Sequence, residues 1–157
     1  ELRSAAGVSL RRLYAIFPSK RDVVAAVLEQ KHREWESGFG TAVAAAGAES
    51  RARLLAVYGY LEQWFCTDGF RGCAFINAFG ELGGTDPDVA RIVREHKASF
   101  QRRMTELASD AGMSETLAAQ LSILAEGAQS TAAIAADPAA AAQARAAAEV
   151  LIDASLR

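Results

Sequence analysis

The strongest constraint on the fold is the helical spacing of apolar residues in a chain with only three prolines. Apolar side chains recur at intervals of three and four residues through most of the 157 residues, and alanine is abundant. The pattern predicts an all-α fold. Because 51% of the residues are hydrophobic and 23% are charged, the chain is expected to fold as a globular protein rather than remain disordered.

Proline and capping signals divide the chain into helices. Pro18 ends a short helix expected over residues 10–17, and Ser19 with Asp22 forms a capping box that opens a longer one. Asp86-Pro87 and Asp137-Pro138 are caps followed by proline, which mark two more helix starts. With further starts at Ser50 and Ser114, about eight helices are predicted, without repeats or a long linker.

The sequence bears on cellular location only through the segments that it lacks. No apolar run is long enough to span a membrane, and no charged and apolar leader opens the sequence, so a cytoplasmic protein is expected. Cys66 and Cys73 lack the spacing of a zinc site or redox motif, and we expect both to be reduced thiols in the core.

Charge is distributed unevenly along the chain. Residues 1–34 carry seven Lys or Arg against four Asp or Glu, whereas the chain as a whole has a net charge of −2. A mildly acidic body with a basic N-terminal end is typical of a protein that touches phosphate with one end only, although a solvated basic surface would have the same composition.

The basic end has the spacing of a DNA-binding helix-turn-helix. A turn containing Gly7 precedes the helix expected over residues 10–17, which would bury Leu13 and Phe17 and present Arg11 and Arg12 outward. Arginine can bind guanine edges or clamp a phosphate. The hydroxyl of Tyr14 can reach a phosphate, and Lys20 lies in the first turn of the next helix, where backbone N–H groups favour one.

The run from Ala6 to Asp22, AGVSLRRLYAIFPSKRD, resembles the signature of the TetR family of bacterial transcriptional regulators. The resemblance covers about the first thirty residues. It implies an all-helical homodimer that binds double-stranded DNA at a palindromic operator and is released when a small-molecule effector binds. Carried over by position, Arg11 and Arg12 would face bases, while Ser9, Tyr14 and Lys20 would hold phosphates.

The expected division is a DNA-binding domain with its linking helix over residues 1–36, and a ligand-binding and dimerisation domain over residues 37–157. The family's first helix would precede the one that Glu1 enters, so upstream residues are expected in the full protein. If Glu1 were instead a natural start, the alternative would be a helical small-molecule-binding or interaction module without DNA binding.

A ligand site is expected where aromatic residues gather between positions 58 and 100. Polar residues interrupt apolar stretches there, and buried polar groups need partners that a ligand can supply. Ordinary core packing, with a histidine satisfied by a neighbouring group, is the alternative. The predicted ligand-binding residues for a small, largely apolar effector are Trp64, Phe65, Phe75, Asn77, Phe79, His96, Phe100 and Gln129.

The last two predicted helices are rich in small residues, which allow close helix approach. A monomer would expose this surface, so pairing with a second copy into a four-helix arrangement is expected, beside ordinary packing within the subunit. The residues predicted at this interface are Leu117, Leu121, Leu124, Ala128, Val150 and Leu151.

Catalysis is not expected. Cys73 with His96, or Cys66 with His32, are the only nucleophile and base pairs worth considering. The sequence has no phosphate loop, no oxyanion-type glycine loop, no paired-carboxylate motif and no metal-ligand spacing, so neither a metal nor a cofactor is expected.

Overall fold

The computed structural model describes residues 12 and 15–155, and the elements assigned there are all helices. They are α3 (Lys20–Ala45), α4 (Ser50–Phe65), α5 (Ala74–Leu82), α6 (Pro87–Asp110), α7 (Glu115–Ala135) and α8 (Ala139–Ser155). The predicted all-α fold is therefore confirmed. Before α3, Arg12, Ala15 and Ile16 are helical and Phe17 is not, as expected for a helix that ends ahead of Pro18.

Side-chain caps fix where the helices begin. The backbone N–H of Asp22 donates to Ser19 Oγ at 3.3 Å, and that of Ser19 donates to Asp22 Oδ2 at 2.8 Å, which completes the predicted capping box of α3. The carboxylate of Asp86 accepts from the first turn of α6 in the same way. The helix α4 begins at Ser50 as predicted, and the side chain of Glu49 supplies its cap.

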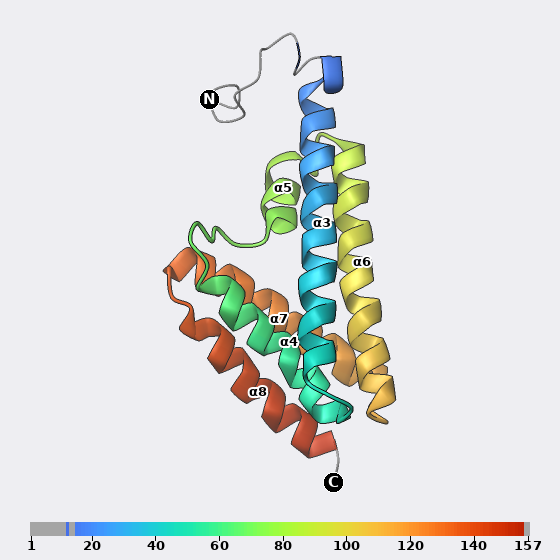
Figure 1. Cartoon of the computed structure of the whole chain (residues 1–157), viewed down its shortest axis with the longest axis vertical. Coiled ribbons are helices and arrows are strands. Elements are labelled where there is room, and N and C mark those ends of the chain that lie inside the picture. Colours follow the sequence, from blue (N-terminus) through green and yellow to red (C-terminus); the bar gives the residue numbers. More distant parts are fainter. Residues whose placement is uncertain (1–11, 13–14, 156–157) are drawn as a thin grey trace.

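Two long helices, α3 and α6, lie side by side and begin at the same end of the molecule (Figure 1). The short α5 packs on both near that end, and α4, α7 and α8 form a bundle against their other halves. The helix α3 continues through Gly38 and Gly40 to Ala45. The expected boundary between residues 36 and 37 therefore falls inside one continuous helix.

The main core lies between α4, α7, α8 and the later halves of α3 and α6. Tyr58, Met104, Leu121 and Ile152 are among its fully buried side chains. The hydroxyl of Tyr58 donates to the backbone carbonyl of Leu121 at 2.8 Å, so this phenol is buried with its polar end satisfied. Desolvation raises the pKa of Tyr58 well above its ordinary value.

Three residues predicted for a dimer interface belong instead to this core. Leu117, Leu121 and Ala128 are buried within the subunit because their side of α7 faces the neighbouring helices. Leu124 and Leu151 are half-buried against the same core, and Val150 is exposed. The helical spacing identified an apolar side of α7 correctly, but that side packs within the subunit.

A different side of α7 and α8 is apolar and exposed. Ile123, Ile134 and Val150 have 70%, 87% and 68% of their surface exposed, respectively. Alanines and Gly127 lie among them, so little side-chain bulk covers the backbone here. We call the surface defined by Ile123, Gly127, Ile134, Ala146 and Val150 the α7–α8 face.

The two cysteines differ in environment. Both thiols are free, but Cys66 is exposed at the end of α4, which corrects the expectation that both lie in the core. Cys73 is buried at the start of α5. No helix in the described part of the chain is long and apolar enough to cross a membrane.

Candidate functional site

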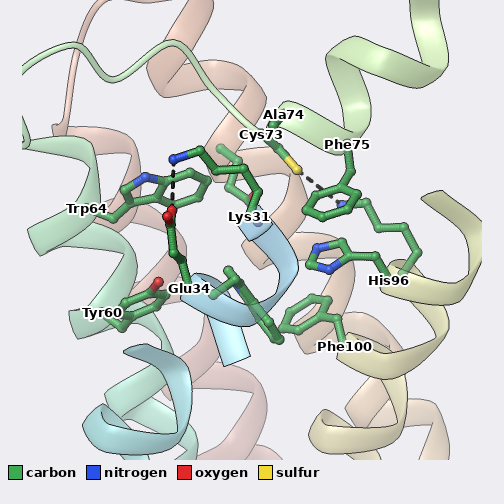
Figure 2. Close-up of a pocket in the computed structure, with 12 residues that line it drawn as sticks. Lys31, Glu34, Tyr60, Trp64, Cys73, Ala74, Phe75, His96 and Phe100 are labelled. Atoms are coloured by element: carbon green, nitrogen blue, oxygen red, sulfur yellow. Dashed lines mark hydrogen bonds and ion pairs between the residues drawn. The ribbon is translucent and has the colours of Figure 1, made fainter. Parts of the chain in front are cut away.

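A cavity of about 170 Å³ lies among five helices, beside the crossing of α3 with α5 and α6 (Figure 2). Aromatic rings form much of its wall, and its charged residues are Lys31, Glu34 and Lys97. The residues that line it are Lys31, Glu34, Trp35, Tyr60, Trp64, Cys73, Ala74, Phe75, His96, Lys97, Phe100 and Gln129. We refer to this cavity as the aromatic pocket.

Five of the eight predicted ligand-binding residues line the aromatic pocket. They come from four different helices and are Trp64, Phe75, His96, Phe100 and Gln129. In the sequence they span more than sixty positions, yet the fold places them around one cavity.

The other three predicted residues lie elsewhere. Phe65 is buried in the main core, with its ring 4.9 Å from that of Phe70. Asn77 is exposed, and its side-chain amide donates to the backbone carbonyl of Arg71 at 3.1 Å. Phe79 is also exposed, with the guanidinium of Arg94 5.9 Å from its ring centroid. Phe75 and Phe79 lie one turn apart on the same side of α5, and only Phe75, near the start of the helix, lines the pocket.

Sequence reasoning missed the contribution of α3 to the pocket. Trp35 lies with its ring 5.4 Å from Phe100 and 4.8 Å from Phe39, and so joins the pocket to the core. Glu34, which directly precedes Trp35, and Lys31, one turn earlier, also line the cavity. The available signal was the spacing of 31, 34 and 35, which places the three on one side of a helix that was expected to act mainly as a linker.

A pair of histidines joins α3 to α6 at the wall of the pocket. His32 Nδ1 and His96 Nδ1 are 2.9 Å apart, so one ring donates its N–H and the other accepts. The ring of Phe75 stacks on His96 with centroids 3.5 Å apart and planes 7° apart. Burial, together with the charge of Lys97 and the proximity of His32, lowers the pKa of His96 to about 3. His96 is therefore neutral at neutral pH.

The two lysines of the pocket differ in how closely a carboxylate approaches their ammonium groups. Lys31 Nζ lies 2.8 Å from Glu34 Oε2, both half-exposed on α3. Lys97 Nζ lies 3.5 Å from Glu126 Oε1 and 3.9 Å from Cys73 Sγ. Charge-assisted hydrogen bonds from ammonium to carboxylate are usually about 2.7–2.9 Å long. Lys31 thus has a close partner, whereas Lys97 is held only loosely.

One glycine explains how Cys73 reaches the pocket. Gly72 has φ +82°, a conformation that side chains rarely adopt, and a Cβ there would lie 2.9 Å from Ala133 Cβ on α7. The connection from α4 to α5 therefore lies directly on α7 and turns sharply at this residue. That turn directs Cys73 and Phe75 into the cavity.

The predicted DNA-binding residues are only partly described. Ser9, Arg11 and Tyr14 lie outside the described residues. Arg12 is helical and exposed, and Lys20 is exposed in the first turn of α3. Next to it, Arg21 Nε lies 2.9 Å from Asp86 Oδ2, so the beginning of α3 is tied to the beginning of α6.

The contacts of the pocket favour binding over catalysis. Among the described residues, the polar contact of Cys73 is with Lys97 and that of His96 is with His32, so the nucleophile and base pairs considered above are not assembled. That same part of the chain contains no group of three His, Cys, Asp or Glu residues that could hold a metal ion. An aromatic wall with a few polar groups is typical of a small-molecule binding site.

Two solved structures share this fold over nearly the whole chain. A TetR-family transcriptional regulator from Streptomyces coelicolor has a TM-score of 0.84 and 26% identity, with 99% of this chain and 82% of that chain covered. A protein assigned as a TetR transcriptional regulator from Streptomyces avermitilis has a TM-score of 0.79 and 28% identity, with 98% and 84% covered. No protein-family model matches the sequence, and no curated protein sequence matches it.

Proposed function

We propose, from the likeness of this chain to TetR-family transcriptional regulators over nearly its whole length, that it is a ligand-responsive repressor that binds a palindromic operator as a homodimer. A small, largely apolar effector enters the aromatic pocket and releases the protein from DNA. The effector binds more tightly to the conformation that fits the operator less well, so by linkage it weakens DNA binding by the same factor.

The basic N-terminal end is the proposed DNA-contacting surface. Arg11 and Arg12 would reach base edges from the helix ahead of Pro18, and Ser9, Tyr14 and Lys20 would hold phosphates. The exposure of Arg12 and of Lys20 supports this assignment. No acidic residue occurs between Arg3 and Arg21, so no carboxylate in this segment offsets its cations where they would meet a phosphate backbone.

The α7–α8 face is the proposed dimer interface. Its exposed isoleucines and valine would be removed from water by a second copy, and its small residues would permit close approach of four helices. Val150, Leu151 and Leu124 remain from the sequence-based set, while Ile123 and Ile134 replace the buried leucines. With one basic end per subunit, a two-fold dimer would place two such ends on successive major grooves.

The observation that carries the proposal is the course of α3. Its first turn contains the exposed Lys20, and further along it contributes Lys31, Glu34 and Trp35 to the aromatic pocket. One continuous helix thus belongs to both proposed sites. A ligand that displaces this helix at the pocket also displaces the residues that would face DNA.

Selection of bound fragments from random DNA with the full-length protein tests the proposal. A palindromic consensus is expected, and the double variant Arg11→Ala with Arg12→Ala should lose specific binding while remaining dimeric in sedimentation. Substituting Arg102 by Ala, an exposed cation far along α6, is the matched control. Recovery of no enriched sequence, or full operator protection by the double variant at moderate salt, would refute the regulator function.

A further inference from the structure

The size of the aromatic pocket limits what can occupy it. An apolar cavity of about 150 Å³ holds a benzene ring, so a cavity of about 170 Å³ accepts one aromatic ring with a small substituent. The wall suits such a ring, because Trp64, Phe75 and Phe100 lie around the cavity (Figure 2) and Trp35 also belongs to its lining.

The polar substituent is indicated by the charges that line the pocket. Lys31 and Glu34 neutralise each other at 2.8 Å and are half-exposed. Lys97 is the remaining charged residue of the lining, and its side chain is largely buried. The pocket therefore presents one ammonium group to a ligand without a carboxylate that is equally available.

The neighbours of Lys97 do not satisfy the hydrogen-bond donors of its ammonium group. Within the described chain, its Nζ is approached by Glu126 Oε1 at 3.5 Å and by Cys73 Sγ at 3.9 Å, both too far for a strong charge-assisted hydrogen bond. Glu126 Oε1 is itself buried without a hydrogen-bond partner and is not part of the lining. A buried ammonium gains most from an ionised oxygen acceptor at short range.

We infer that the aromatic pocket takes a single-ring aromatic acid, with the ring against Trp64, Phe75 and Phe100 and the carboxylate on Lys97. His96 and Gln129 supply neutral polar groups beside it. This assignment rests on the proposed role of the pocket as the effector site and names the chemical class of that effector.

The tryptophans of the chain can report ligand binding by their fluorescence. The chain contains two tryptophans, Trp35 and Trp64, and both line the pocket. Intrinsic fluorescence excited at the red edge of indole absorption therefore reports on ligand entry. Three probes share one ring and differ in charge: benzoate, benzyl alcohol and benzylamine.

Benzoate should bind the native chain at least about tenfold more tightly than benzylamine, and the affinity of benzyl alcohol should lie between the two. The reason is that the carboxylate of benzoate gains a charge-assisted hydrogen bond from Lys97, whereas the ammonium group of benzylamine is repelled by it. Lys97→Met should weaken benzoate binding about tenfold and change benzyl alcohol binding less than about threefold. Lys97→Arg, which keeps the charge, should retain the order of the three probes.

Arg102→Met is the matched control, because this cation belongs to the same helix as Lys97 but is exposed and is not part of the lining of the pocket. It should leave the preference for benzoate in place. The assignment is overturned if benzylamine binds as well as benzoate, if no probe quenches either tryptophan, or if Lys97→Met preserves the preference.

These outcomes are separate from those of the operator experiment. Probe binding is measured without DNA, so a preference for benzoate in a chain that selects no DNA sequence would retain the ligand class and reject the regulator. Operator selection by a chain that prefers benzylamine would retain the regulator and reject the ligand class.

Discussion

Arg21 at the start of α3 and Asp86 at the cap of α6 form an ion pair, 2.9 Å between Nε and Oδ2, that joins two environments. The side chain of Arg21 is 68% exposed, whereas that of Asp86 is 5% exposed. Asp86 Oδ1 also accepts from the backbone N–H groups of Asp88 and Val89 at 3.1 and 3.2 Å. The buried carboxylate thus holds the first turn of α6 and the first turn of α3 together.

The two partners should differ in their contribution to stability. Asp86→Ala removes a helix cap and is expected to lower the free energy of unfolding by about 1–2 kcal/mol. Arg21→Ala removes the exposed partner and should cost less than about 1 kcal/mol. Urea denaturation of both variants at neutral pH measures the difference. Equal losses would mean that the ion pair, rather than the cap, is the main role of Asp86.

Acid should destabilise the fold through His96. Its pKa is about 3 in the folded chain and about 6.5 when unfolded, so above pH 6.5 it is neutral in both states. As the pH falls from about 6.5 toward 3, the unfolded state takes up a proton that the folded state does not, and stability is lost by at most about 1.4 kcal/mol per pH unit.

His96→Phe isolates this effect from the titration of carboxylates. The native chain should lose up to about 2 kcal/mol more than the variant between pH 7 and pH 5, measured by urea denaturation at both values. The same loss in both proteins would show that His96 is protonated in the fold.

The exposed Lys20 should contribute one phosphate contact. Lys20→Ala is expected to weaken binding to all DNA sequences similarly and to reduce the slope of log affinity against log salt by about 1. Fluorescence anisotropy over a salt series gives the slope, and Arg102→Ala should leave it unchanged. A change in sequence preference with an unchanged slope would place Lys20 at a base instead.

The two sides of α7 should respond differently to a charge. Ile134→Asp is expected to convert the dimer to a folded monomer, because the side chain is 87% exposed in the single subunit. Leu121→Asp should unfold the chain, since that residue is completely buried. Sedimentation and circular dichroism distinguish these results. A dimer that survives Ile134→Asp would move the interface away from the α7–α8 face.

Helix boundaries could be predicted well because they depend on neighbouring residues. The capping box of Ser19 and Asp22 and the cap at Asp86 are local chemistry, and both are present in the structure. Gly38 and Gly40 left the end of α3 open in the sequence, and in the structure the helix continues through them while Phe39 and Val43 pack into the main core.

The orientation of residues within helices was harder to predict. Apolar spacing shows that α7 has an apolar side but does not say whether that side meets its own subunit or another, and so Leu117 and Leu121 were assigned to the wrong contact. In α5, Phe75 and Phe79 lie one turn apart on the same side, so helical spacing alone could not separate the residue that lines the pocket from the one that lies outside it. The loose environment of Lys97 depends on α5, α6 and α7 together.

The length of α3 gives the molecule a mechanical property. Its 26 residues extend about 39 Å at about 1.5 Å per residue, and its later part is clamped in the core by Phe39 and Val43. Lys20 lies about 22 Å from Trp35 along this rod, so a tilt of about 5° at the aromatic pocket moves the first turn by about 2 Å. If α3 pivots at Trp35 when the pocket is filled, even a single-ring occupant would shift the first turn of the helix and strain the ion pair between Arg21 and Asp86.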